Sequence, residues 1–217
     1  MMSHRRHPAL TEAKLYGILD VGYVSRDDTL AMAGMMLDGG VQLLQLRAKG
    51  ESSREVRSMA CELAPLCRAH NVPFLLNDHP ELVRETGADG AHVGQDDLSV
   101  AEARALAGEN AIIGKSTHSI AQALAAEQEG PDYIGFGPLF VTPTKPDYTP
   151  IGVSEIRQVR RLVSLPVFCI GGIKRENLAG VLAAGAQRVV IVSGILHASD
   201  PQAYCWACRV LLASVPD

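Results

Sequence analysis

The sequence lacks the features that would place it among nucleic-acid-binding, membrane or secreted proteins. Its 217 residues carry a net charge of −4 and a pI near 6.0, so we do not expect a nucleic acid as a partner. The apolar runs are far too short to cross a bilayer. The N-terminal stretch MMSHRRHPALTEAK contains no apolar segment of the kind that defines a secretory signal. We predict a flexible N-terminal arm over residues 1–13 and no membrane association.

The cysteines do not form the pattern of a disulfide framework. Five are present, an odd number at irregular spacing, and no set of His and Cys residues has structural-zinc spacing. A reduced, cytoplasmic protein fits this count better. Cys205 and Cys208 form a CxxC pair, but they lie inside a predicted final helix. Their i, i+3 spacing there favours burial on one helix face over redox chemistry.

What the sequence does contain is a repeated alternation of two kinds of segment. Short apolar runs, typical of strands buried on both faces, occur at residues 14–20, 41–48, 72–78, 90–94, 111–117, 133–140, 166–172 and 188–195. Between them lie Ala-, Leu- and Glu-rich stretches with helical spacing, including residues 53–70, 100–108, 119–130, 153–163 and 175–185. Residues 14–217 are therefore predicted to form one α/β domain, a (β/α)8 TIM barrel with its active site at the C-terminal ends of the strands. A doubly wound open sheet is the alternative, although no GxGxxG follows the first predicted strand.

Polar residues gather where the predicted strands end. The second strand ends in Gln45, Arg47 and Lys49, whose period-two spacing puts all three on one face of an extended chain. Arg can bind phosphate through two parallel hydrogen bonds and Lys adds a point charge, so this face favours an anion site. A strand that simply emerges into solvent would also carry Lys and Arg, and this interpretation stays open.

Carboxylates follow the third and fourth predicted strands. Asn77 and Asp78 end the third strand, and Asp97 follows the fourth. Mg²⁺ is typically held by one or two carboxylates together with substrate phosphates, and Asp78 and Asp97 fit this pattern. Beside Arg47 and Lys49 they would complete a diphosphate clamp. Each aspartate is also explained as a helix N-cap or turn residue.

Hydroxyl groups and glycines occupy the later strand ends. Ser116 is a candidate anion donor, while the neighbouring His118 is either a proton shuttle or an idle turn residue. Gly172 and Ser193, after the seventh and eighth strands, lie where barrels of this type often bind phosphate.

The stretch PLFVTPTKPDYTP, residues 138–150, follows the sixth predicted strand. Its length and position favour a binding loop in which Thr142, Thr144 and Lys145 reach the ligand. Pro143 and Pro146 would stiffen the loop and lower the entropy lost on binding. A surface turn rich in Pro and Thr is the alternative.

Seven segments, in order, carry a resemblance to one family: QLRAK (45–49), LND (76–78), GADGAHVGQDDL (87–98), IGKSTHS (113–119), GFGPLFVTPTK (135–145), CIGGI (169–173) and VSGI (192–195). With these segments the sequence resembles thiamine phosphate synthase, also called thiamine-phosphate pyrophosphorylase. The resemblance implies a (β/α)8 barrel and an Mg²⁺-dependent transferase. Such an enzyme joins the diphosphate of 4-amino-5-hydroxymethyl-2-methylpyrimidine to a thiazole phosphate and releases thiamine monophosphate and pyrophosphate. In this family the pyrophosphate departs first, and the thiazole nitrogen then captures the pyrimidine carbocation.

The resemblance also implies roles for individual residues. Those expected to hold the pyrimidine diphosphate are Gln45, Leu46, Arg47, Ala48, Lys49, Asn77, Ser116 and Lys145. The thiazole phosphate is expected to contact Thr142, Pro143, Thr144, Gly172, Val192 and Ser193. Asp78 and Asp97 would bind Mg²⁺, and the residues acting in catalysis would be Arg47, Lys49, Ser116 and Lys145. The first strand, LYGILDVGYV, departs from the family pattern and receives no role, and neither does Lys115.

Other functions remain to be weighed against this one. A thiazole tautomerase would share the barrel and would move protons with a His near position 118, without a diphosphate clamp. A catalytically silent regulatory homologue is a further alternative, although the intact set of charged residues counts against it. A phosphate-binding isomerase or aldolase is disfavoured because no Lys stands out as a Schiff-base former. The residues show no convincing nucleophile–base pair. The sequence does not determine the oligomeric state, and a homo-oligomer stays open.

Overall fold

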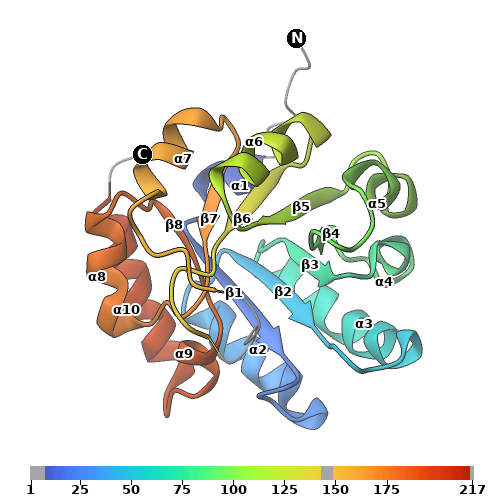
Figure 1. Cartoon of the computed structure of the whole chain (residues 1–217). Helices are drawn as coiled ribbons and strands as arrows, with labels where there is room; N and C mark the ends of the chain where they lie inside the picture. Colours follow the sequence, from blue (N-terminus) through green and yellow to red (C-terminus); the bar gives the residue numbers. More distant parts are fainter. Residues whose placement is uncertain (1–7, 143–148, 216–217) are drawn as a thin grey trace.

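The computed structural model describes residues 8–142 and 149–215 and confirms the closed parallel barrel (Figure 1). The strands are β1 (Leu15–Asp20), β2 (Leu43–Arg47), β3 (Phe74–Asn77), β4 (Gly90–Val93), β5 (Ile112–Thr117), β6 (Tyr133–Phe136), β7 (Val167–Cys169) and β8 (Arg188–Ile191). Each pairs in parallel with the next, and β8 closes the barrel by pairing with β1, with Tyr16 opposite Val190.

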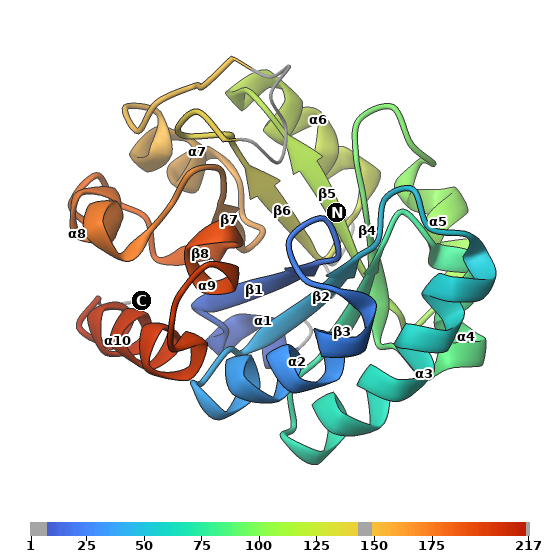
Figure 2. The same ribbon diagram turned by 90° about the horizontal axis from the view of Figure 1, so that it is seen from below.

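Helices surround the barrel, as Figures 1 and 2 show. The helices are α1 (Pro8–Glu12), α2 (Thr29–Asp38), α3 (Ser53–Ala69), α4 (Val83–Thr86), α5 (Val100–Ala107), α6 (Ile120–Glu129), α7 (Ile156–Leu162), α8 (Arg175–Ala183), α9 (Ser193–Leu196) and α10 (Pro201–Ala213). Short 3-10 turns, η1 (Arg26–Asp28) and η2 (Pro80–Leu82), precede α2 and α4. In the part of the chain that the structure describes, no helix is long and apolar enough to span a membrane.

Strand alternation divides the apolar residues between two cores. Inward-facing side chains such as Leu43, Leu75, Ile112 and Phe168 fill the barrel interior. The alternate residues of the same strands pack beneath the helices in the larger outer core. Because successive side chains on a strand point to opposite faces, one strand serves both cores, which explains why the runs are apolar throughout.

Local signals set several helix ends. Ser52 accepts a hydrogen bond from the Glu55 N–H while Glu55 reaches back to the Ser52 N–H, a capping box that starts α3. Ser119 caps α6 by accepting from the Gln122 N–H at 3.2 Å. These caps fix where each helix begins relative to the strand end that precedes it.

The N-terminal segment differs from the expected flexible arm over residues 1–13. Residues 8–12 form α1, and Leu10 and Ala13 are 1% exposed and belong to the barrel-interior core. Arg188 and Gln42, at the starts of β8 and β2, donate to the carbonyls of Thr11 and Glu12. The segment is folded because its apolar residues cover the interior core at the N-terminal ends of the strands. Residues 1–7 lie outside the described residues.

The eighth strand is also shorter than the sequence predicts. The apolar run extends to residue 195, but β8 ends at Ile191 and the helix α9 begins at Ser193. The apolar run continues because Ile195 and Leu196 are buried on the helix. A short apolar run does not distinguish a buried strand from a buried helical turn.

Candidate active site

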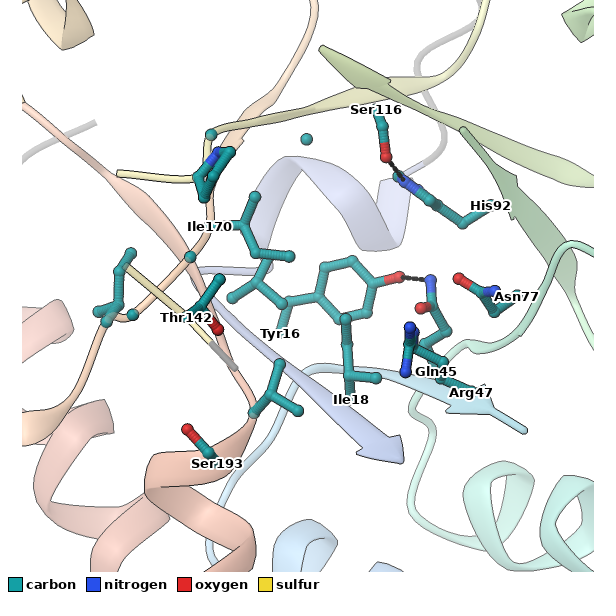
Figure 3. Close-up of a pocket in the computed structure, with 18 of the residues that line it drawn as sticks. Tyr16, Ile18, Gln45, Arg47, Asn77, His92, Ser116, Thr142, Ile170 and Ser193 are labelled. Carbon is teal, nitrogen blue, oxygen red and sulfur yellow. Dashed lines mark hydrogen bonds between the residues drawn. The ribbon is translucent and has the colours of Figure 1, made fainter. Parts of the chain in front are cut away.

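A pocket opens at the C-terminal ends of the strands, where the barrel architecture predicts it (Figure 3). It holds about 870 Å³ of space between the side chains, part of it open to solvent. Polar side chains of Gln45, Arg47 and Asn77 lie on one side, and Thr142 and Ser193 lie on the other. The Tyr16 ring and apolar side chains, including Ile170, lie between the two sides.

Arg47 on β2 is held by a residue that received no role from the sequence. Asp20, the last residue of β1, places Oδ2 2.5 Å from Arg47 Nη1. Asp20 is 2% exposed and Arg47 is 14% exposed, so this is a largely buried ion pair. Asp20 Oδ1 also accepts from the Gly22 N–H at 2.9 Å, which fixes the carboxylate. The guanidinium is therefore presented to the pocket in one orientation.

Lys49 lies apart from Gln45 and Arg47, in a recess beside the main pocket. Its Nζ is 3.5 Å from Asp78 Oδ2. Asp78 adopts φ +62°, and its carboxyl meets that of Asp97, whose Oδ2 accepts from the Gly94 N–H at 2.7 Å. Burial, and next the nearby Asp97, raise the pKa of Asp78, while Lys49 opposes this rise.

This carboxylate pair has the donor chemistry for a hard divalent cation. Two aspartates that approach this closely repel each other when both are ionised, and a cation between them would remove the repulsion. Among the described residues no group of three or more His, Cys, Asp or Glu side chains could hold a metal ion. A site with two protein carboxylates leaves the remaining positions to water and substrate oxygens, which suits Mg²⁺. The residues fit this ion.

The capping explanation does not apply to either aspartate. Ser99, not Asp97, caps α5, accepting from the Glu102 N–H. His79, not Asp78, precedes η2. Asp97 does accept from the Gly94 N–H within its own loop, as a turn residue would, and Asp78 meets Lys49.

A buried hydrogen-bonded chain crosses the barrel beneath the pocket. Gln45 Nε2 donates to the Tyr16 hydroxyl at 2.5 Å, and the hydroxyls of Tyr16 and Tyr133 are 3.0 Å apart. His92 Nδ1 is 2.9 Å from the Tyr133 hydroxyl, and His92 Nε2 is 2.9 Å from Ser116 Oγ. Figure 3 shows the Gln45–Tyr16 and Ser116–His92 contacts at the two ends of this chain.

The Ser116–His92 contact bears on the expectation that the residues hold no convincing nucleophile–base pair. Its geometry resembles a serine–histidine dyad, but the other ring nitrogen of His92 meets a phenol and not a carboxylate. Burial raises the pKa of Tyr133 well above its ordinary value, so this phenol stays neutral and cannot stabilise an imidazolium as an aspartate would. The pair is therefore poorly suited to nucleophilic catalysis.

The opposite side of the pocket is built from the strand ends predicted to bind phosphate. Thr142, Gly172, Val192 and Ser193 all line it. Gly172 has φ +64°, and a Cβ there would lie 2.7 Å from Phe140 Cβ and 2.9 Å from the Val141 carbonyl oxygen. Only glycine allows this close approach of the β6–α7 and β7–α8 loops.

His118 also lines the pocket, so it is more than a turn residue on the surface. Its Nδ1 meets the Gly137 carbonyl oxygen at 2.5 Å. That contact requires Nδ1 to carry a proton, so it fixes the tautomer and the ring orientation. Thr117, beside it, is buried and donates to the Gly135 carbonyl at 2.9 Å.

The structure places the predicted site residues in different surroundings, with Asp97 beside Asp78. Pocket-lining residues are Gln45, Arg47, Asn77, Ser116, Thr142, Gly172, Val192 and Ser193, whereas Ala48, Lys49 and Asp78 line the recess. The Leu46 side chain is buried in the outer core, so its predicted contact with a substrate would be made by its backbone. Pro143, Thr144 and Lys145 lie outside the described residues.

Four residues of the site are not predicted by the sequence patterns: Asp20, Tyr16, His92 and Tyr133. Each lies within a predicted apolar strand run, and His92 also falls in the segment 87–98, but none of them received a role. Tyr16, His92 and Tyr133 occupy inward-facing strand positions, where a polar side chain in a barrel is a signal in itself. Lys115, on the outward face of β5, instead approaches Glu129 of α6, with 3.9 Å between Nζ and Oε2. Cys205 and Cys208 are buried in α10, as their spacing predicted.

Comparisons with known proteins agree with this arrangement. A family model described as thiamine monophosphate synthase matches residues 15–195. The chain is 38% identical to a thiamine-phosphate synthase of Pelotomaculum thermopropionicum, with 100% of both proteins covered. It is 39% identical to that of Chloroflexus aurantiacus, with 94% of each covered. It is 45% identical over 162 residues to that of Gloeobacter violaceus, but the match covers only 48% of that longer relative.

Solved structures show the same likeness. A thiamine phosphate pyrophosphorylase from Pyrococcus furiosus superposes with a TM-score of 0.87 at 30% identity, covering 96% of this chain and 99% of that one. A 3-hexulose-6-phosphate synthase superposes with a TM-score of 0.67 at 15% identity, which shows a shared barrel fold and no more.

Proposed function

The chain belongs to the thiamine monophosphate synthase family, and from that premise we propose that it joins hydroxymethylpyrimidine diphosphate to a thiazole phosphate. Thiamine monophosphate and pyrophosphate are the products. The observation that carries the proposal is the division of one pocket into two polar sides. Arg47, Asn77 and Ser116 lie on one side and Thr142 and Ser193 on the other, with Tyr16 and Ile170 between them. Gly172 also lines the pocket and packs against Val141, beside Thr142.

The first side suits a leaving diphosphate. The departing group gains negative charge as its bond to the pyrimidine carbon breaks, and groups that are already oriented stabilise this charge best. Arg47, held by Asp20, supplies positive charge from a fixed position, and the more exposed Lys49, beside Asp78, adds a second positive charge. Ser116 adds a hydroxyl at the wall of the pocket. Lys145 remains part of the proposal as a third cation.

Asp78 and Asp97 are proposed to hold Mg²⁺ on this side. When bound, the ion would supply positive charge to the diphosphate oxygens. The chain contributes two carboxylates, one of them fixed by the Gly94 N–H. The same carboxylates would repel the diphosphate if no cation lay between them.

The second side suits the phosphate of the acceptor. Gly172 lets the β7–α8 loop pack closely against the β6–α7 loop at this end of the pocket, and Thr142 and Ser193 add hydroxyl groups. Ile170, Val192 and the ring of Tyr16 form apolar surface between the two phosphate sites, where the two heterocycles would meet. The task of the protein is then to place two reactants and to exclude water, which needs no strong base.

The direct test is pyrophosphate release by the purified protein with both precursors and Mg²⁺, omitting each in turn. Release that requires all three, with thiamine monophosphate formed in step, supports the proposal. Folded protein that releases no pyrophosphate contradicts it, and isomerisation of the thiazole would then be measured because His118 also lies in the pocket.

The metal assignment has its own test, which does not depend on turnover. Mg²⁺ together with inorganic pyrophosphate should raise the melting temperature of the wild-type protein, because both bind the folded state. Asp97→Asn should lose this increase, whereas Asp96→Asn, which removes an adjacent exposed carboxylate, should keep it. An Asp97→Asn protein with the wild-type increase and wild-type turnover would remove Asp97 from the proposed site.

A cytoplasmic location is also part of the proposal. It is supported by five free cysteines, four of them buried, in a fold that uses no disulfide for its stability.

A further inference from the structure

The chain Gln45–Tyr16–Tyr133–His92–Ser116 has a direction. Gln45 Nε2 donates to the Tyr16 oxygen, so the single proton of Tyr16 goes to its other partner, the Tyr133 oxygen. Tyr133 must then give its own proton to His92 Nδ1. A His92 ring that accepts at Nδ1 carries its proton on Nε2 and donates to Ser116 Oγ. The proton of Ser116 is left for the pocket.

The side chains of Tyr16 and Tyr133 both stay neutral within the hydrogen-bonded chain. Burial raises the pKa of Tyr16 and of Tyr133 above the ordinary value, so each keeps one proton and passes one hydrogen bond onward. Both rings are also fixed: they pack edge to face on each other and on Phe168. The hydroxyl groups therefore have little freedom to choose other partners.

Strand β5 carries a glycine, Gly114, where it passes the hydrogen bond between Tyr133 and His92. A Cβ on Gly114 of β5 would lie 2.5 Å from His92 Nδ1 and closer still to the Tyr133 hydroxyl. Any side chain at this position would displace the contact between Tyr133 and His92. Glycine is thus required here by the close approach of the two polar groups.

We propose that Tyr133 and His92 are positioning residues that set the hydrogen-bonding character of both ends of the chain, making Ser116 a donor and Gln45 Oε1 an acceptor toward the ligand. The pocket then selects a molecule with an amino group at the Gln45 end and an anionic oxygen at the Ser116 end. If Gln45 were rotated, each proton would reverse, and the two ends would exchange character together. Tyr133 does not line the pocket and acts only through its neighbours.

This inference rests on the proposed function for the identity of the ligand, in which the pyrimidine supplies the amino group and the diphosphate supplies the oxygen. The direction of the chain can be tested without it. The ¹⁵N shifts of His92, assigned with a His92→Gln variant, should show the tautomer with its proton on Nε2. In Tyr133→Phe the tautomer should change, because Nδ1 has lost the phenol that donates to it. A wild-type ring with its proton on Nδ1 would overturn the proposal, whatever the activity.

Kinetics test the positioning role. Tyr133→Phe keeps the ring and removes only the hydroxyl, and the loss of this hydrogen bond should lower kcat/KM for the pyrimidine diphosphate about tenfold. The KM for the thiazole phosphate should not change. Thr86→Val is the matched control: it also removes a buried hydroxyl, one that donates to the Leu82 carbonyl at 2.8 Å, far from the chain. It should alter stability and leave both kinetic constants unchanged.

Two further results separate positioning from a general loss of structure. In a Ser116→Ala background, Tyr133→Phe should lose the part of its effect that passes through Ser116, so the double variant should lose less kcat/KM than the product of the two single losses. A pyrimidine analogue with a 4-oxo group in place of the 4-amino group should be rejected strongly by the wild type and much less by Tyr133→Phe, in which Gln45 can rotate. The proposal would be overturned if the losses of kcat/KM in Tyr133→Phe and Ser116→Ala simply multiplied in the double variant and Tyr133→Phe still rejected the 4-oxo analogue as strongly as the wild type does. Absence of wild-type turnover would defeat the proposed function but leave the tautomer measurement decisive.

Discussion

Asp20 Oδ2 lies 2.5 Å from Arg47 Nη1, and this ion pair joins the ends of two adjacent barrel strands. The two residues are also register partners on β1 and β2. Because Asp20 is 2% exposed, its carboxylate has few partners other than Arg47 and the Gly22 N–H. The pair therefore fixes the direction in which Arg47 meets a ligand.

Asp20→Asn should lower both activity and stability. The change leaves a largely buried guanidinium without its counter-charge, at a cost of about 3 kcal/mol in the free energy of unfolding. The misplaced guanidinium should reduce kcat/KM for the pyrimidine diphosphate at least about tenfold. Urea denaturation and steady-state kinetics measure the two effects.

The exposed pair between Arg57 and Glu85 provides the control for Asp20→Asn. Its side chains are 54% and 40% exposed, so Glu85→Gln should leave kinetics unchanged and alter stability little. In an Arg47→Met background, Asp20→Asn should have almost no further effect on kcat/KM. A full additional loss there would show that Asp20 acts by another route.

Gly172→Ala should impair the acceptor side of the pocket. The added Cβ would lie 2.7 Å from Phe140 Cβ and would push the two loops apart. If the displacement costs about 1.4 kcal/mol in binding, the KM for the thiazole phosphate rises about tenfold.

Gly152→Ala is the control that isolates the backbone contribution. Gly152 also has a positive φ, +72°, but among the described residues no atom lies within 4 Å of the place that a Cβ would take. It should cost about 1 kcal/mol of stability and leave the KM unchanged. Equal effects on KM would contradict the close-approach argument.

Thiol reactivity should separate one cysteine from the other four. Cys61 is exposed, whereas Cys67, Cys169, Cys205 and Cys208 are buried. Burial raises the pKa of the Cys205 thiol to about 12 and that of Cys208 to about 11, which leaves almost no thiolate at neutral pH. A colorimetric thiol reagent should modify one thiol in the native protein and five after denaturation. Rapid modification of Cys205 or Cys208 in the folded protein would revive a redox role for the pair.

His70 at the end of α3 should make stability depend on pH. A hydrogen bond to the Leu66 carbonyl, and next one to Asp38 at 3.1 Å, raise the pKa of His70. A raised pKa means that the folded state binds the proton more tightly. The resulting stability is fully present below about pH 6.5, the unfolded value, and is lost as the pH rises through the folded pKa. His70→Gln should flatten this part of the urea-midpoint profile. An unchanged profile would show that His70 does not cause the dependence.

Much of the fold could be predicted from local sequence alone. Apolar runs located every strand of the barrel, and Ser52 and Ser119 cap the helices that begin beside them. These signals are local, because capping and side-chain alternation involve residues only a few positions apart. The N-terminal segment was missed since Leu10 is buried by contacts with distant strands and by no local pattern.

In the candidate site, too, local patterns predicted some positions, whereas contacts between distant segments decided others. Period-two spacing placed Gln45 and Arg47 on one inward face, and the structure confirms it. Lys49 instead turns into the recess with Asp78, because β2 has ended at Arg47 and alternation no longer holds. Asp20 holds Arg47 in place, and His92 contacts Ser116. The roles of Asp20 and His92 could not be predicted from the sequence, because each role depends on a partner from another strand.

The sequence by itself therefore determined the barrel and the strand ends at which polar groups stand. The tertiary structure decided which of those groups meet. Tyr16 and Tyr133 are separated by 117 residues and Arg47 and Asp20 by 27, yet each pair is in hydrogen-bond contact. The physical reason is that periodicity depends on the geometry of one segment, whereas a contact between strands depends on the register and closure of the whole barrel.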